Sequence, residues 1–309
     1  MSLLTVPETE CFVGDQAREL RALVSGQSSH CERSRPESVR SCRSLAVLSG
    51  KGGVGKSVVA LNLAMALAHR GESIGLWDAS AGVGHLSLLC GQNGYWNLSH
   101  VLAGSRSLDE IVLHGPNGIR IVPGVGHLSE ISASAGRIVQ SLADCEKQHD
   151  WLIVDAGVSA SPSARQFACS ADCALLVTTP EPTAVAETYA AMKSLASTSG
   201  GVVSVLVNQA DSEQQALQIL ERLRHAARTF LRSDISRAGY VPRDEAVCRS
   251  VGLRKPLATI HPDGPAQQAI VRVAERIHRT VAAHRGQSFT ERMVSSNATT
   301  LDHRESAQT

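Results

Sequence analysis

The chain has 309 residues and a formal net charge of +1, so no overall field attracts it to nucleic acid or acidic lipid. Hydrophobic residues make up 43% of the sequence, enough for a sizeable core, whereas aromatic residues make up only 3%, which argues against base-stacking surfaces for single-stranded nucleic acid. The longest apolar runs have strand length, which excludes a transmembrane span, and we expect no secretory signal because the N-terminus lacks a basic region followed by an apolar one.

Residues 1–43 are expected to form a disordered polar leader with one short helix at about 14–24. Leu20, Leu23 and Val24 fall on one stripe of that helix. The rest of the leader is rich in serine and arginine, which is typical of a linker.

From residue 44 to residue 285 the sequence alternates near-continuous apolar strands with helical segments. This alternation predicts one α/β domain, a doubly wound and mainly parallel sheet with helices on both faces. The polar tail 286–309 is expected to be disordered. The expected strands are 45–49, 73–78, 119–124, 151–156, 174–179 and 202–208, and the expected helices are 56–71, 135–147, 183–198, 212–230 and 265–284.

The segment 50-GKGGVGKS-57 joins the first core strand directly to a helix. That context is typical of a P-loop, in which glycines let backbone N–H groups cradle phosphate oxygens at a helix N-terminus. Lys56 would reach the β- and γ-phosphates of ATP, and the Ser57 hydroxyl would bind Mg²⁺. The expected nucleotide-binding residues of the loop are Gly50, Lys51, Gly52, Gly53, Val54, Gly55, Lys56, Ser57 and Val58.

Two acidic residues end core strands, where ligands of an open α/β sheet gather. Asp78 ends the second strand, and Asp155 ends 152-LIVD-155. As a strand-terminal acid, Asp155 suits the role of a Walker B acid, which holds Mg²⁺ through a bound water. The alternative for Asp155 is a helix or turn cap.

Lys51 is not required for cradling phosphate, and it resembles the signature lysine of the ParA/MinD ATPases. The resemblance implies an ATP-dependent homodimer in which this lysine crosses to the partner's ATP, and catalytic roles for Lys51, Asp78 and Asp155. The segment 78-DASAG-82 departs from the family's usual Asp-x-Asp, because Ser80 replaces the acid that positions the attacking water. In 155-DAGVSAS-161, Ser159 stands where relatives have a glycine. Both departures leave ATP binding intact and put hydrolysis in doubt.

Two further segments resemble the flagellar MinD-like ATPases, known as FlhG, FleN or YlxH. The first is 178-TTPEPTAVAETYAAMKSL-195, and the second is 15-DQARELR-21 in the leader. In that family the second motif docks on the signal-recognition-type GTPase FlhF. The alternative is a chance amphipathic turn. The residues expected to contact such a partner are Asp15, Gln16, Ala17, Leu20 and Arg21.

The same resemblance implies adenine contacts near the end of the domain. Asn208 ends the strand 202–208 and carries an amide that can pair with the adenine edge. Pro242 and Asp244, in the turn 241-VPRD-244, resemble the family's Pro-x-Asp segment beside the base. A proline in a turn also has a simple structural explanation.

The segment 267–285 has an apolar stripe with arginines beside it. It is interpreted as the closing helix of the domain, packing its stripe on the sheet. The alternatives are an interfacial membrane helix, giving peripheral membrane contact, or nonspecific contact with DNA. Specific recognition of nucleic acid is not expected.

The eight cysteines form no Cys-x-x-Cys pair, so reduced thiols in a cytosol are the simplest interpretation. A metal site at Cys169 and Cys173 stays open as an alternative, although no second ligand pair is visible. We expect a cytoplasmic location, with the inner face of the cell membrane left open as a peripheral one.

The leading hypothesis is a slow ATPase switch that regulates flagellar number or placement. A scaffold that binds ATP without hydrolysing it is the main rival, favoured by Ser80 and Ser159. A septum-placing or DNA-partitioning relative would need a membrane helix or a basic surface, and an iron–sulfur carrier would need paired cysteines. A P-loop kinase would not explain Lys51.

Overall fold

The computed structural model describes residues 42–80, 84–124, 135–196, 201–282 and 287–295. The expected leader helix at about 14–24 and its motif 15–21 lie outside the described residues, and their role stays a prediction.

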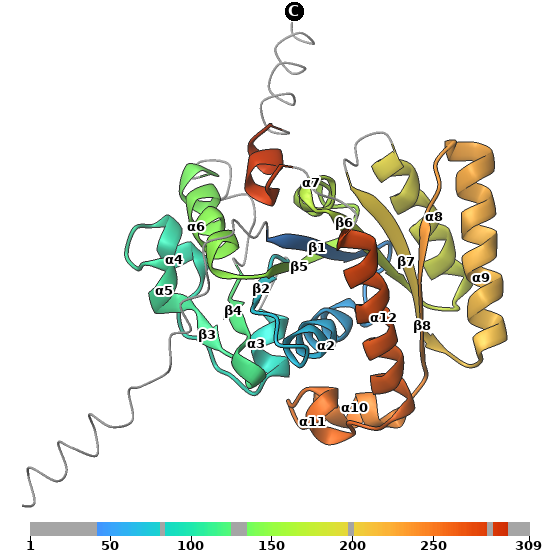
Figure 1. The fold of residues 1–309 in the computed structure, drawn as a ribbon, viewed down its shortest axis with the longest axis horizontal. Helices are drawn as coiled ribbons and strands as arrows, with labels where there is room; N and C mark the ends of the chain where they lie inside the picture. Colours follow the sequence, from blue (N-terminus) through green and yellow to red (C-terminus); the bar gives the residue numbers. More distant parts are fainter. Residues whose placement is uncertain (1–41, 81–83, 125–134, 197–200, 283–286, 296–309) are drawn as a thin grey trace, which may run out of the picture. The chain divides into compact units, whose positions relative to one another are not determined.

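The described residues from Cys42 onward are built on one eight-stranded sheet in the order β3-β4-β2-β5-β1-β6-β7-β8 (Figure 1). Neighbouring strands are parallel except for β3 and β4. The predicted fold class, a doubly wound and mainly parallel α/β sheet, is confirmed. The strands are β1 (Arg43–Ser49), β2 (Ile74–Asp78), β3 (Leu113–His114), β4 (Arg120–Val122), β5 (Trp151–Val158), β6 (Cys173–Thr178), β7 (Val202–Ala210) and β8 (Ser236–Pro242).

Helices cover both faces of the sheet (Figure 1). Helices α6, α7, α8 and α9 pack on one face, and α2 and α12 pack on the other. The helices are α2 (Lys56–Ala68), α3 (His85–Leu89), α4 (Leu98–Leu102), α5 (Leu108–Ile111), α6 (Ala135–Gln148), α7 (Pro162–Ser170), α8 (Pro182–Ala196), α9 (Glu213–Ala226), α10 (Glu245–Gly252), α11 (Leu257–Ile260) and α12 (Pro265–Ala282), with a 3₁₀ turn at Pro116–Gly118 and a π turn at Ala227–Leu231.

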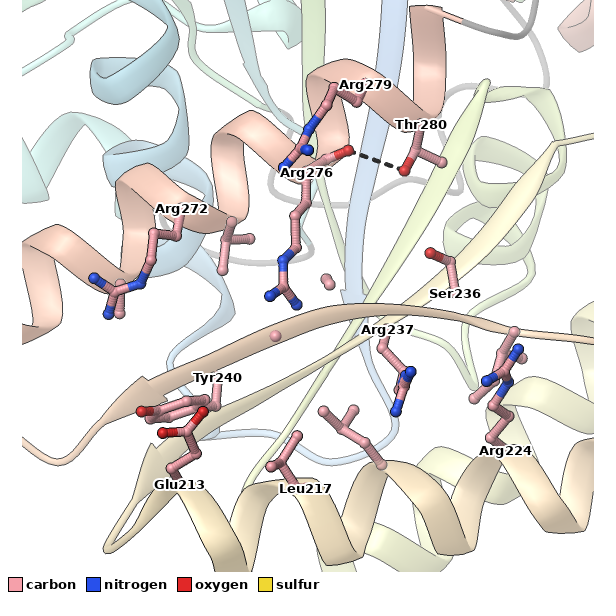
Figure 2. A pocket seen from close by; sticks show the side chains of 16 residues that line it. Glu213, Leu217, Arg224, Ser236, Arg237, Tyr240, Arg272, Arg276, Arg279 and Thr280 are labelled. Atoms are coloured by element: carbon pink, nitrogen blue, oxygen red, sulfur yellow. Dashed lines mark hydrogen bonds between the residues drawn. The ribbon is translucent and has the colours of Figure 1, made fainter.

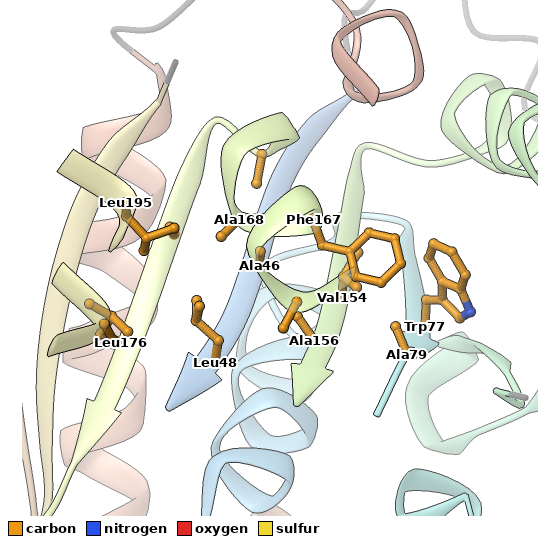
Figure 3. Close-up of a cluster of buried hydrophobic side chains, with 14 of the residues drawn as sticks. Ala46, Leu48, Trp77, Ala79, Val154, Ala156, Phe167, Ala168, Leu176 and Leu195 are labelled. Carbon is orange, nitrogen blue, oxygen red and sulfur yellow. The ribbon is translucent and has the colours of Figure 1, made fainter. Parts of the chain in front are cut away.

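The central strands are buried on both sides, which explains their continuous apolar sequences. In β1, Ala46 and Leu48 join the core under α7, whereas Leu45 and Val47 join the core under α2. Figure 3 shows the first of these clusters, where Trp77 and Phe167 meet edge to face with ring centroids 5.1 Å apart. The double-sided packing fixes the carboxyl ends of β1, β2 and β5, from which the functional segments leave.

The apolar stripe of α12 is fully used inside the domain. Ile270, Val273 and Ile277 are each 2% exposed and pack in the core formed by α12, α2 and one face of the sheet. The closing-helix interpretation is therefore confirmed, and the interfacial membrane helix is contradicted, because its apolar face is already covered. Among the described helices, none is long and apolar enough to cross a membrane.

Some ordered structure was not predicted. The sequence did not predict strand β8, nor α7, in which Phe167 is the one large apolar residue.

The expected domain end at 285 also differs from the structure, since residues 287–295 are described and Phe289 and Met293 are buried in the core. The Glu146 carboxylate anchors this segment by accepting hydrogen bonds from the backbone N–H groups of Phe289 (2.8 Å) and Thr290 (3.1 Å).

Candidate nucleotide site

The glycine-rich loop lies between the end of β1 and the first turn of α2, as the sequence predicts. Gly53 and Gly55 have φ angles of +81° and +85°, in the left-handed region that favours glycine. Gly55 is the N-cap of α2, and no side chain caps this end. The first backbone N–H groups of α2 therefore lack a capping side chain, which is the arrangement that binds phosphate.

Gly50 is required by a close approach of α8. A Cβ at this position would lie 2.4 Å from the backbone carbon and 2.5 Å from the backbone oxygen of Glu187. Backbone atoms inside a helix cannot move aside cheaply, so a side chain would displace the loop or the helix. At Gly52, by contrast, a Cβ would meet no atom within 4 Å.

Asp155 lies beneath the loop with its carboxylate fully buried. The Lys56 ammonium is 3.5 Å from its Oδ1 atom, and neither carboxylate oxygen accepts a well-formed hydrogen bond within the described part of the chain. Burial raises the pKa of Asp155, while the Lys56 charge and the Ser57 hydroxyl act in the opposite direction. A buried carboxylate whose oxygens accept no well-formed hydrogen bond, next to the Ser57 hydroxyl, suits a hydrated Mg²⁺, which prefers oxygen ligands.

Asp78 is buried, and its carboxylate accepts hydrogen bonds from the segment that follows β2. Its Oδ1 atom accepts hydrogen bonds from the Ser80 hydroxyl at 2.6 Å and from the Ser80 N–H at 3.3 Å, and its Oδ2 atom accepts from the Leu86 N–H at 3.1 Å. Asp78 and Asp155 are register partners on β2 and β5. The Ser80 hydroxyl therefore donates its proton to Asp78, which removes it as a free donor at the site.

Strand β5 continues past Asp155 to Val158, so Asp155 lies within the strand and not at its end as the sequence predicted. The pairing with β1 shifts register at Gly157, whose φ angle of +86° favours glycine. Ser159 is buried, and its N–H donates to the Ser49 carbonyl at 2.8 Å. Ser49 is the last residue of β1, immediately before the loop. The backbone at Ser159 is thus tied to the base of the loop in this state.

Lys51 lies at the loop surface and is bound within its own chain. Its ammonium is 2.7 Å from Glu181 Oε2 and 3.0 Å from Thr183 Oγ1, at the start of α8. The hydrogen bond from Lys51, together with its charge, holds the pKa of Glu181 below its ordinary value. Glu181 and Thr183 belong to the segment 178–195 that resembles the flagellar ATPases. In the sequence, only their polarity close to the start of a helix indicates that they could hold Lys51.

The expected adenine residues divide into two kinds. The Asn208 amide donates to the Val54 carbonyl at 2.8 Å and packs where a Cβ on Gly55 would lie, so Asn208 contacts the loop directly. The Asp244 carboxylate caps α10 through the Ala246 N–H at 2.8 Å, and its other oxygen is 3.3 Å from the Ala266 N–H at the start of α12. Asp244 thus has a structural role that its place before a helix indicates.

Pro242 is the last residue of the edge strand β8, where the missing N–H is tolerated. Among the expected site residues, the structure therefore brings together the loop, Asp78, Asp155 and Asn208. An adenine contact by Pro242 or Asp244 stays a prediction.

A glycine-rich loop at a parallel strand's end, with a lysine paired to a buried acid on the next strand, defines a P-loop nucleotide-binding protein. The chain belongs to the ParA/MinD family of P-loop ATPases. It is 33% identical over 266 residues to antiactivator FleN of Pseudomonas aeruginosa, covering 82% of this chain and 94% of that protein. It is 29% identical over 235 residues to flagellum site-determining protein YlxH of Helicobacter pylori, covering 74% and 80%.

A solved structure shares the fold, and a family model matches part of the chain. Septum site-determining protein MinD from Pyrococcus horikoshii, complexed with Mg-ADP, superposes with a TM-score of 0.65 at 21% identity, covering 76% of this chain and 96% of that one. Residues 41–91 match the ParA family model, described as NUBPL iron-transfer P-loop NTPase. The predicted resemblance to the ParA/MinD family, with flagellar relatives, is confirmed.

Proposed function

We propose that this protein is a MinD-like switch that binds Mg·ATP at residues 50–58, dimerises on it and regulates flagellar number or placement. The observation that carries the proposal is the 3.5 Å contact beneath the loop between the Lys56 ammonium and the buried Asp155 carboxylate, because a cation and an acid in this arrangement suit the phosphates and the magnesium of Mg·ATP. The flagellar relatives FleN and YlxH support the process. A cytoplasmic location follows from this role.

Hydrolysis in this proposal is slow. When bound, Mg²⁺ would neutralise charge on the transferred phosphoryl group. Ser57 and Asp155 would hold it, Lys56 would bind the phosphates, and Asp78 would order the segment after β2. Ser80 cannot accept a proton as a carboxylate does, and its hydroxyl is engaged with Asp78.

Dimerisation would move Lys51 from Glu181 to the partner's ATP, so that only the ATP-bound dimer presents its composite surface. The leader motif 15–21 would contact an FlhF-type GTPase. The ATP state would then decide which partner is bound.

The proposal is tested by titrating Mg·ATP and by measuring phosphate release at saturating ATP, alone and with an FlhF-type GTPase. We expect tight binding with slow release in the parent, and loss of both in Lys56→Ala. An inability of the parent to bind Mg·ATP would refute the proposal.

A second candidate is an ATP-locked scaffold, favoured by the 2.6 Å hydrogen bond from the Ser80 hydroxyl to Asp78. It differs from the slow ATPase in one outcome. Tight binding without any phosphate release, with or without the GTPase, would support the scaffold, and its function would then rest on what 15–21 contacts.

A further inference from the structure

The free edge of the sheet, remote in strand order from the loop, carries a deep groove. Strand β8 is the last strand of the sheet, and α9 and α12 flank it on the two faces. The hollow has a volume of about 830 Å³ and runs between these three elements (Figure 2). We call it the edge groove, and it is lined chiefly by Leu217, Arg237, Tyr240, Arg272, Arg276 and Arg279.

The α12 wall of the edge groove is positively charged. Arg272, Arg276 and Arg279 are exposed, and none of them pairs with a carboxylate within the described ranges. By contrast, Arg237 pairs with Glu221, and Arg224 pairs with Asp234 at 3.0 Å. Three cations of α12 therefore have no anionic partner among the residues that the structure describes.

Arg276 is directed toward the strand itself. A Cβ on Gly239 would be 3.6 Å from its Nη1 atom, and Figure 2 shows its guanidinium pointing from α12 toward β8. Gly239 has a φ angle of +123° and follows a register shift between β7 and β8. The Arg276 guanidinium thus lies over the backbone of β8 beside Gly239.

The α9 wall is different in character. Leu217 is 43% exposed at this wall, and the buried Leu220 and Ile235 continue the apolar surface inward. Glu213 lies at one end, close to Tyr240 (Figure 2). The edge groove therefore has a cationic wall and an apolar wall with a strand edge between them.

We propose that the edge groove binds an extended acidic segment of a partner protein as an added strand along β8. An edge strand presents unpaired N–H and C=O groups that suit another strand. Because successive side chains of a strand point to opposite faces, alternate residues of the segment would meet α12 and α9. The groove thus selects alternating acidic and apolar residues, the acidic ones facing Arg272, Arg276 and Arg279.

A peptide fits these walls better than nucleic acid or lipid. Nucleic acid has an anionic backbone without the alternation of acidic and aliphatic side chains that would match the two walls, and the chain has few aromatic residues for stacking bases. A lipid surface needs apolar groups that protrude, whereas the stripe of α12 is buried.

The test uses a labelled synthetic peptide of alternating Glu and Val with the full chain. We expect it to bind the parent and to bind Arg272→Glu/Arg276→Glu roughly a hundredfold more weakly, because two attractive contacts become repulsive. The control is Arg165→Glu/Arg249→Glu, which makes the same charge change at exposed residues of α7 and α10, outside the groove. It should bind like the parent.

Two further peptides test the strand arrangement. A peptide with the same residues in separate Glu and Val blocks should bind weakly, and an alternating Lys and Val peptide should prefer the Arg272→Glu/Arg276→Glu variant. Methylation of the backbone amides on the peptide edge that would pair with β8 should abolish binding, because those N–H groups could no longer donate to the strand.

Unaltered far-ultraviolet circular dichroism and Mg·ATP binding would show that the variants are folded. Equal binding by the parent and Arg272→Glu/Arg276→Glu, or no binding to either, would overturn the proposal. So would arginine-dependent binding of duplex DNA or phosphatidylglycerol vesicles in place of the peptide.

Discussion

The phosphate loop and the segment after β2 lie at the same edge of the sheet. They differ in how many of their polar groups already have hydrogen-bond partners within the chain. In the loop, α2 starts without a side-chain cap, and neither oxygen of Asp155 accepts a well-formed hydrogen bond in the described region. After β2, by contrast, both carboxylate oxygens of Asp78 accept hydrogen bonds, and the Ser80 hydroxyl is engaged with one of them. The difference implies that nucleotide binding and nucleotide turnover are separable in this protein.

The largest effect is expected from Lys56→Ala, which removes the cation at the centre of the loop. Loss of one partner of a buried charged pair should weaken Mg·ATP binding by about a hundredfold or more. It should also destabilise the apo protein by roughly 3 kcal/mol, because the Asp155 charge stays buried alone. Calorimetric titration and chemical denaturation measure the two effects.

The loss of stability in Lys56→Ala should depend on pH. The pKa of Asp155 is raised above its ordinary value of 3.8 by burial, so the folded state holds this proton more tightly than the unfolded chain. Its stabilising contribution is full below the unfolded pKa and is lost as pH rises through the raised pKa. Destabilisation by Lys56→Ala should therefore be larger at neutral than at acid pH, and Asp155→Asn should restore stability without restoring ATP binding. A pH-independent loss would contradict the buried pair.

The next effect comes from the approach of α8 to the loop. Gly50→Ala should cost about 2 kcal/mol, since its methyl would overlap the backbone of Glu187. Gly52→Ala is the matched control, because its methyl enters open space. The melting temperature in the absence of nucleotide should fall clearly for the first variant and little for the second. Equal effects would mean that α8 does not pack on the loop in solution.

A smaller and opposite effect is expected from Ser80→Asp. The new carboxylate would lie beside Asp78 and restore an acid that can position water, so phosphate release should rise roughly tenfold. The same proximity of like charges should lower the free energy of unfolding by about 1–2 kcal/mol. Ser80→Ala removes the hydroxyl without adding an acid and should leave release at the parent's level. An unchanged rate in Ser80→Asp would place the limit elsewhere, at Ser159 or in the dimer.

The sequence predicted the fold and the loop because both rest on strong local patterns, continuous apolar strands and glycines at fixed spacing. It could not predict β8, where Ser236, Gly239 and Pro242 hide an edge strand whose β-structure depends on pairing with β7. The burial of Phe289 likewise depends on a distant partner, Glu146. The bond from Ser80 to Asp78 is a choice of rotamer, which residue identity alone does not determine.

The smallest effect concerns Lys51. This lysine binds Glu181 in the single chain and would contact the partner's ATP in the dimer. Glu181→Gln removes the negative charge that holds Lys51 within its own chain at 2.7 Å. Both side chains are exposed, so folding stability should hardly change. Freed from this competing contact, Lys51 should cross to the partner's ATP more readily, and the dimer should form at a few-fold lower protein concentration in Mg·ATP.

Sedimentation velocity with Mg·ATP and with Mg·ADP measures this shift. Thr183→Val is the matched control, because it removes the 3.0 Å contact to Lys51 without changing the charge, and its effect should be smaller. Lys51→Ala should abolish the ATP-dependent dimer in either background. If Glu181→Gln instead weakens the dimer, Glu181 acts across the interface, and the contact within the chain is not a competitor of dimerisation.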